Sequence, residues 1–259
     1  MQLLDERATE LRDRHGITFR ITGVASRHLG WNANPEGFDP PALVGAGACE
    51  ILGSNRSLTN VRDWLDAAQA DVLFEATSLN VETGQPAIDH IRVALEHGAH
   101  AITANKGPIV HAYRELRDLA AKQRKRFLFE STVMDGVPIF SLFAQLPAIH
   151  LLGFHGILNS TTNVILSEME QGLSFEIALK KAQQLGIAET NVTHDVEGWD
   201  AAVKTAALVT VLMDVPIRLD EIDREGIRDL TPHALRNARR DGWPFKLVCR
   251  AQRTPDGVK

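Results

Sequence analysis

The sequence is poor in cysteine, the residue that builds disulfide frameworks and redox pairs. Its 259 residues include two, Cys49 and Cys249, which lie far apart in the chain and form no C-x-x-C or other metal-ligand spacing. The sequence therefore predicts neither a redox pair nor a cysteine-based metal site. We expect reduced thiols, as in a cytoplasmic protein.

Long apolar runs are also missing. The runs VLFEAT and TAALVTVLM are too short to span a membrane, and the N-terminus MQLLDERATELRDRHG is charged and helix-like, unlike a signal peptide. A net charge of −5 does not give the positive charge with which proteins bind nucleic acid or an anionic membrane. We therefore expect neither as a partner. No H-E-x-x-H or G-x-S-x-G occurs, so zinc-peptidase and hydrolase functions lack support.

The glycine-rich turn of dinucleotide-binding proteins is a further absence. The segment GAGACEIL at 45–52 contains G-x-G, but Glu50 stands where the third glycine of G-x-G-x-x-G belongs. The segment also follows PPALV, which is a poor strand, so we interpret it as unrelated to phosphate binding. Two explanations stay open: the sequence lacks its start, or the protein does without the usual pyrophosphate loop.

What the sequence does contain is an alternation of short apolar strands with amphipathic helices. This rhythm predicts right-handed βαβ units and a parallel sheet, hence an α/β fold. The Gly/Pro/Asn-rich segment 28–41 is predicted to be a loop. The expected strands are 17–26, 70–78, 100–107 and 126–133, and the expected helices are 2–15, 57–70 (capped by Ser57 or Thr59), 86–99 and 112–125.

After Val137 the regular alternation of strands and helices ends, and we place a domain boundary near residue 135. Residues 1–135 are predicted to form an incomplete Rossmann-type domain without its first strand and glycine-rich loop. Residues 136–259 are predicted to form a second α/β domain, in which one helix is capped by Ser160 or Thr161 and the next by Ser174.

Small polar residues and one lysine follow the predicted parallel strands. Ligands in such sheets bind beyond the carboxyl ends of the strands, so together these residues favour a nucleotide crevice. The residues concerned are Arg27, Thr77, Ser78, Asn105 and Lys106.

The stretch Leu185–Lys204 concentrates charge beside an apolar helix. It holds the carboxylates Glu189, Asp195, Glu197 and Asp200, and a helix apolar nearly all round is predicted over 199–213. Asp200 and Lys204 lie four residues apart, hence on one face of that helix. Such a pair is either structural or part of a site, and the acids upstream favour a site. His194 beside Asp195 is interpreted as a solvated or structural histidine.

Five motifs in this order resemble homoserine dehydrogenase: ITANKGP, FESTVMDGVPI, GILNSTTNVIL, GIAETNVTHDVEGWDAAVK and EGIRDL. The resemblance runs from about Leu3 to Gln252, and it predicts a family member that lacks both ends. It implies an NAD(P)-dependent oxidoreductase that interconverts L-homoserine and L-aspartate 4-semialdehyde, as in threonine, methionine and isoleucine biosynthesis. It further implies a Rossmann-type domain, a substrate domain that also dimerises, and a homodimer.

The resemblance also assigns roles to single residues. Lys204 falls on the acid/base lysine and Lys106 on a second active-site lysine near the nicotinamide. Glu189, Asp195, Asp200 and Thr161 fall on substrate-binding positions, and Thr77 on a cofactor-binding one. A sodium-type cation held mainly by backbone carbonyls would involve Glu130, Val133, Asp135 and Val137.

Two positions depart from the family pattern: Ile187 replaces a common aromatic residue, and Ser160 a common glycine. Arg27 at a strand end favours NADP, because an arginine there can bind the ribose 2′-phosphate of that cofactor. The alternatives are a non-catalytic homologue that keeps the fold but binds dinucleotide poorly, and a related amino-acid dehydrogenase.

Overall fold

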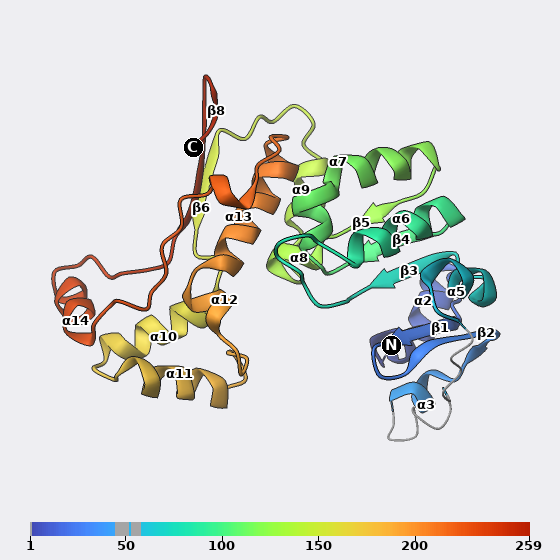
Figure 1. Cartoon of the computed structure of the whole chain (residues 1–259), viewed down its shortest axis with the longest axis horizontal. Coiled ribbons are helices and arrows are strands. Elements are labelled where there is room, and N and C mark those ends of the chain that lie inside the picture. Colours follow the sequence, from blue (N-terminus) through green and yellow to red (C-terminus); the bar gives the residue numbers. More distant parts are fainter. Residues whose placement is uncertain (1, 45–51, 53–57) are drawn as a thin grey trace. The chain divides into compact units, whose positions relative to one another are not determined.

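The computed structural model describes residues 2–44, 52 and 58–259, which fall into two compact units (Figure 1). Unit 1 holds Met1–Ala76, Pro86–Ile102 and Arg114–Leu128. Unit 2 holds Thr77–Gln85, Thr103–Tyr113 and Phe129–Lys259, which is the whole of the expected second domain with three segments of the expected first domain, the last of them 129–135. The G-x-G at Gly45, Cys49 and Ser57 lie outside the described residues.

Unit 1 contains a three-stranded sheet with the order β3-β4-β5. Its strands are β3 (Val72–Glu75), β4 (His100–Thr103) and β5 (Phe127–Leu128), and β4 pairs with β5 in parallel. The α/β class with parallel pairing is thereby confirmed. The predicted strand 126–133 is too long, because α8 (Ser131–Met134) begins three residues after β5 ends.

The predicted loop 28–41 is wrong, because it contains a strand. β2 (Gly30–Phe38) pairs antiparallel with β1 (Ile21–Ser26), and Gly30 and Gly37 supply the positive φ angles of 69° and 100° at either end of β2. Trp64 holds β2 in place: its ring packs edge-on against that of Trp31, and its indole donates a hydrogen bond of 2.7 Å to the carbonyl of Asn32. The residues after β1 therefore form the turn of an antiparallel hairpin.

Helices complete unit 1. They are α1 (Gln2–Glu6), α2 (Ala8–His15), α3 (Pro40–Val44), α5 (Val61–Ala68), α6 (Ala87–His97) and the second part of α7 (Gly107–Lys122). Buried apolar residues of α5 and α6 pack with Leu73 of β3. Asn60 caps α5 by accepting from the amide of Asp63 at 2.9 Å, so the expected cap at Thr59 is wrong.

Four helices of unit 2 share one core. These are α10 (Ser160–Glu170), α11 (Phe175–Gln184), α12 (Thr193–Val196) and α14 (Pro232–Arg240). Ile165, Leu166 and Met169 of α10 are fully buried against them. Ser174 caps α11, as predicted, whereas α10 is capped by Asn159 and the expected caps Ser160 and Thr161 are wrong.

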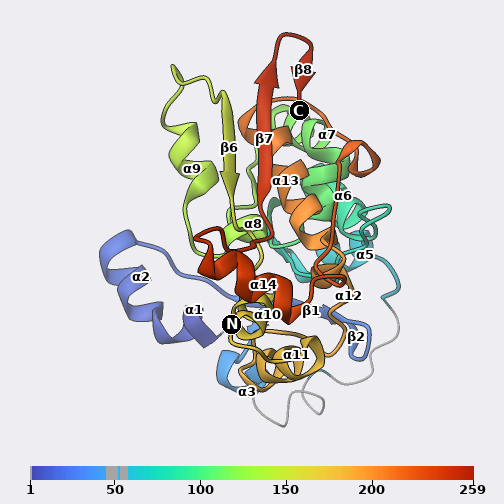
Figure 2. The ribbon, with the colours of Figure 1, turned by 90° about the vertical axis from the view of Figure 1, so that its left-hand side faces the viewer.

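A second layer of unit 2 places helix α13 (Trp199–Leu212) against a sheet. The sheet has the order β6-β7-β8, and Figure 2 shows β6 (Gly153–Gly156) and β7 (Cys249–Thr254) side by side, with α13 next to β7. Strand β8 (Gly257–Val258), the helix α9 (Ile139–Ala144) and a short 3-10 turn (Leu219–Glu221) complete the unit. The predicted buried helix is confirmed, and Cys249 is a free, buried thiol.

No helix among the described residues has both the length and the apolar character needed to cross a bilayer.

A close backbone approach fixes the start of α13. A Cβ on Gly226 would lie 2.5 Å from the carbonyl oxygen of Val196 and 3.0 Å from Cα of Glu197. We expect Gly226→Ala to lower the free energy of unfolding by about 1–3 kcal/mol, because the backbone must move to admit the methyl group. Urea denaturation measures this. Gly156→Ala is the control, since a Cβ there meets nothing within 4 Å, and an equal loss in both variants would contradict the steric explanation.

Candidate active site

The charged pair predicted on α13 forms as the spacing requires. Gly198 begins the helix with a left-handed φ of 78°, which places Asp200 in the first turn, where the helix dipole favours a carboxylate. One turn later the ammonium group of Lys204 lies 2.8 Å from Asp200 Oδ2. Lys204 also donates to the carbonyl of Leu158 at 2.8 Å. An ammonium group has three hydrogens, so one remains for a substrate oxygen.

Asp200 joins a second lysine to the same site. Lys106 Nζ lies 3.4 Å from Asp200 Oδ1, and the side chains of both are mostly buried, with exposed fractions of 20% and 17%. Lys106 directly precedes helix α7, whereas Lys204 lies nearly one hundred positions later. The structure therefore brings both predicted catalytic lysines to one carboxylate.

Asp195 completes this cluster through a residue that sequence reasoning missed. Asn159 donates from Nδ2 to Asp195 Oδ1 at 2.5 Å and to Asp200 Oδ2 at 3.0 Å. Asparagine is among the preferred helix caps, so its position just before the predicted helix start was the available signal. The adjacent Ser160 and Thr161 obscured it, because both are also good caps.

The pKa values of the two aspartates in the cluster are shifted in opposite directions. Burial raises the pKa of Asp195, with help from the charges of Asp200 and Glu189, and the hydrogen bond from Asn159 and the charge of Lys204 only partly offset this. Burial would raise the pKa of Asp200 as well, but the charges of Lys204 and Lys106 and two hydrogen bonds lower it. Asp200 therefore stays ionised, while Asp195 can respond to pH.

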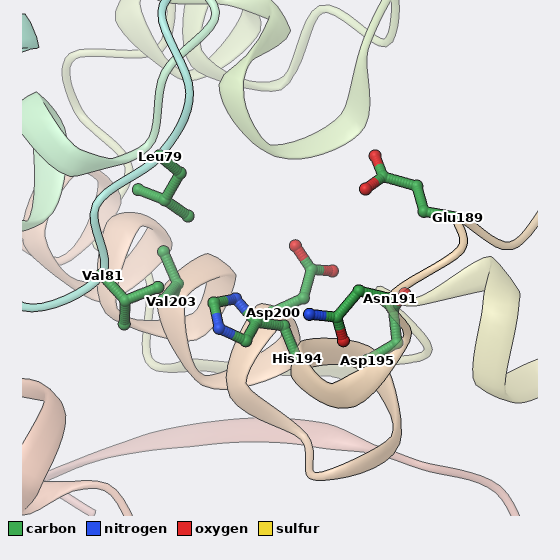
Figure 3. A pocket seen from close by; sticks show the side chains of 8 residues that line it. All are labelled: Leu79, Val81, Glu189, Asn191, His194, Asp195, Asp200 and Val203. Atoms are coloured by element: carbon green, nitrogen blue, oxygen red, sulfur yellow. The ribbon is translucent and has the colours of Figure 1, made fainter.

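A pocket of about 300 Å³ opens beside this cluster. In Figure 3, apolar side chains lie on one side and Glu189 on the other, with Asp200, Asn191 and His194 between them. His194, interpreted from sequence as a solvated or structural histidine, is exposed, and it also lines the pocket from the short helix α12. The lining residues are Leu79, Val81, Glu189, Asn191, His194, Asp195, Asp200 and Val203. The pocket has the size of a small-molecule site.

The remaining expected substrate residue, Thr161, is buried and donates from Oγ1 to the carbonyl of Ile187 at 3.1 Å. This bond anchors the loop that leads to Glu189. Thr161 therefore shapes the wall of the site.

The expected cofactor residues divide between the two units. In unit 2, Asn105 donates to the carbonyl of Thr77 at 3.0 Å and that of Ser78 at 3.5 Å, and it accepts from the amide of Gly107 at 2.9 Å. Its carboxamide thus organises a polar turn around Lys106. Arg27 belongs to unit 1, in the turn between β1 and β2. The premise that it follows a parallel strand is wrong.

The expected cation residues lie around helix α8. The carboxylate of Glu130 accepts from the amides of Phe140 and Ser141 at 2.8 and 2.9 Å, so its side chain caps α9. The backbone reverses at Asp135, where φ is +50°. The carbonyl of Val137 accepts from the amide of Ile139 at 2.8 Å. Among the described residues, no group of three or more His, Cys, Asp or Glu side chains could hold a metal ion.

The pH response of Asp195 gives a direct test of this geometry. Below its raised pKa the side chain is neutral, and above it the carboxylate attracts a cation. We expect affinity for a small ammonium ligand in this pocket to increase as pH rises through the raised pKa of Asp195. Calorimetric titration at several pH values measures this. In Asp195→Asn the dependence should flatten, and an unchanged profile would show that Asp195 is not the titrating group.

Comparisons with known proteins agree along the whole chain. The sequence matches the family described as "Homoserine dehydrogenase, NAD binding domain" over residues 1–130 and the family "Homoserine dehydrogenase" over 138–259. It is 38% identical to an NAD(+)-dependent homoserine dehydrogenase of Pseudomonas canavaninivorans, covering 99% of this chain and 74% of that protein. It is 42% identical to a homoserine dehydrogenase of Methanocaldococcus jannaschii, covering 72% of this chain but only 56% of that protein.

Solved structures of the same kind are similar in fold. A putative homoserine dehydrogenase from Archaeoglobus fulgidus superposes with a TM-score of 0.83 at 30% identity, over 97% of this chain and 76% of that one. A homoserine dehydrogenase from Thiobacillus denitrificans superposes with a TM-score of 0.77 at 31% identity, over 99% of this chain and 56% of that one. The chain thus spans between about half and three quarters of these relatives.

Proposed function

Because the chain belongs to the homoserine dehydrogenase family, we propose that it acts as a dinucleotide-dependent oxidoreductase that interconverts L-homoserine and L-aspartate 4-semialdehyde. The observation that carries this proposal is Asp200 held between Lys204 and Lys106 beside the pocket. Oxidation of an alcohol needs a group that takes the hydroxyl proton. Besides its contacts with Asp200 and Leu158, the Lys204 nitrogen has one hydrogen-bonding position left for the substrate hydroxyl.

The substrate is an amino acid with a terminal hydroxyl, and each of its groups has a counterpart in the site. Its ammonium group would bind the carboxylates of Asp195 and Glu189 by charge-assisted hydrogen bonds. Its carboxylate would lie at the N-terminus of α10, where the helix dipole favours an anion. This pose would leave the terminal hydroxyl for Lys204.

In the oxidation direction, Lys204 would act as the neutral amine, take the hydroxyl proton of homoserine and become the ammonium group. A bound nicotinamide supplies hydride acceptance from the adjacent carbon. In the reverse direction the Lys204 ammonium would return the proton to the aldehyde oxygen. Asp200 keeps its charge throughout and orients both lysines, while Lys106 and the turn at Thr77, Ser78 and Asn105 would hold the nicotinamide end.

We propose NAD, and not NADP, as the dinucleotide that this protein uses. The argument for NADP rested on Arg27 after a parallel strand, and that residue lies in an antiparallel turn. The relative from P. canavaninivorans is named NAD(+)-dependent and is 38% identical. A homodimer, the monovalent cation at Glu130, Val133, Asp135 and Val137, and a role in threonine, methionine and isoleucine biosynthesis are likewise proposed from the family resemblance.

The test is an assay of the purified protein with L-homoserine and either NAD or NADP. We expect absorbance of the reduced nicotinamide to increase, with aspartate semialdehyde as the product and NAD preferred. L-serine and L-threonine as substrates separate this function from a related amino-acid dehydrogenase. Homoserine and dinucleotide binding without turnover, or no dinucleotide binding at all, would favour the non-catalytic homologue.

A further inference from the structure

Asn159 lies at the centre of the charged cluster, although the chemistry proposed above does not use it. The side chain is buried, with the residue 4% exposed. Its Oδ1 accepts from the amide and the hydroxyl of Thr162 at 2.8 and 3.0 Å, while its Nδ2 donates to Asp195 and Asp200. A carboxamide has two donor hydrogens and two acceptor lone pairs, so every hydrogen-bonding position is used.

The orientation of this carboxamide is fixed by its partners. If the group were turned over, its carbonyl oxygen would face two carboxylates and its NH₂ would face the amide of Thr162. Both contacts would be unfavourable, so the four hydrogen bonds hold the group in one position. The first turn of α10 is thereby connected to α12 and α13, which carry Asp195 and Asp200.

The two carboxylates need such a connection. Asp195 and Asp200 repel each other when both are charged, as the effect of Asp200 on the pKa of Asp195 indicates. Asp200 has two lysines to hold it, but among the hydrogen bonds of the described residues, Asp195 receives one only from Asn159. A neutral donor holds Asp195 without cancelling its charge, which a lysine in the same place would do.

We infer that Asn159 is a positioning residue: its NH₂ group bridges Asp195 and Asp200 and keeps Asp195 aimed at the pocket for a substrate ammonium group. The inference rests on the proposed function for the identity of that substrate. Asn159 itself reaches the pocket only through the two carboxylates. It is therefore distinct from the residues that bind substrate.

The test is Asn159→Ser in the full chain, with Ser174→Ala as the matched control. Serine can accept from the amide of Thr162 and so keeps the helix cap, but it removes both donor bonds to the carboxylates. Ser174 caps α11 and is not among the pocket-lining residues, so its loss should lower the melting temperature without altering the site. Asn159→Asp is a second variant that keeps the cap and replaces the donor by a third carboxylate.

Two readouts are needed. The first is the titration of Asp195, followed by carboxyl-carbon NMR without any ligand; groups near it are Glu189, His194, Asp200, Lys204 and, beyond Asp200, Lys106. The second is the dissociation constant for L-homoserine from calorimetry. For Asn159→Ser we expect the Asp195 titration to move to higher pH and homoserine binding to weaken at least about tenfold. Asn159→Asp should also bind homoserine poorly at neutral pH, because a third carboxylate repels Asp195 and Asp200 instead of donating to them.

Each result has a definite meaning. An Asp195 titration that stays in place in Asn159→Ser, or a shift equal to that in Ser174→Ala, would overturn the inference while leaving the proposed function intact. If the titration moves but the unsubstituted protein binds no homoserine, the bridging role is supported and the proposed substrate is wrong. A shifted titration together with weakened homoserine binding supports both.

Discussion

Replacing Lys204 with methionine is expected to lower kcat for homoserine oxidation by about 10²–10⁴-fold while the fold is retained. Methionine keeps an unbranched apolar side chain of similar length but has no proton to exchange. The loss should appear in kcat because the hydroxyl proton moves in the chemical step. The measurement is the steady-state formation of reduced nicotinamide at saturating homoserine, together with a circular dichroism spectrum of the variant.

The matched control is Lys181→Met. Lys181 also pairs with a carboxylate, Glu168, at 2.7 Å, but its side chain is about half exposed and lies outside the pocket lining. This variant should retain its rate. If Lys204→Met kept a rate within about tenfold of the unsubstituted protein, Lys204 would not be the acid/base group. Lys106, the other lysine at Asp200, would then be the candidate.

Replacing Asp200 with leucine should impair both stability and activity. The substitution leaves the ammonium groups of Lys204 and Lys106 without their shared carboxylate, and it removes a partner of Asn159. Breaking a partly buried pair in this way is expected to lower the free energy of unfolding by about 1–3 kcal/mol, less than for a fully buried pair. Turnover should fall to near background, because neither lysine is then held in place.

Urea denaturation at several pH values checks the stability part. Because folding lowers the pKa of Asp200, its stabilising contribution is complete above the unfolded-state pKa of aspartate and is lost as pH falls through the lower folded-state pKa. The difference between Asp200→Leu and the unsubstituted protein should therefore shrink in acid. Asp220→Leu is the control, since Asp220 pairs with Arg218 on the surface and should matter little. A constant difference at all pH values would contradict the electrostatic explanation.

Some parts of this molecule follow directly from sequence. Helix α13, predicted as 199–213 and observed as Trp199–Leu212, and its Asp200–Lys204 pair depend only on helical periodicity, so a local pattern is sufficient. The contact of Lys106 with Asp200 was not predicted: strand alternation placed Lys106 at a strand end, and the family resemblance placed it near the nicotinamide. The prediction of the helix and its Asp200–Lys204 pair is confirmed because local pattern and global fold agree there.

Other parts depended on contacts that no local pattern reveals. Segment 28–41 has loop-like composition, but Trp64 from α5 holds it as strand β2. Asn159 stands next to two residues that are equally plausible helix caps. Its place in the site depends on Asp195 and Asp200 lying within hydrogen-bond distance of its NH₂ group, which only the folded structure shows. His194 and Asp195 are adjacent on the short helix α12, and that both line one pocket depends on how this helix packs, which the sequence pattern does not reveal.

The division of the chain into units bears on how this protein could be recombined with its relatives. The region similar to the NAD-binding family, 1–130, contains Lys106 and the segment Thr77–Gln85, both of which belong to unit 2 with Asp200. A fragment limited to 138–259 would keep Lys204 and Asp200 but lose the second lysine and the pocket walls Leu79 and Val81. Exchanging region 1–130 between homologues therefore transplants part of the candidate site, and if the proposed function holds, cofactor preference and substrate preference should change together in such chimeras.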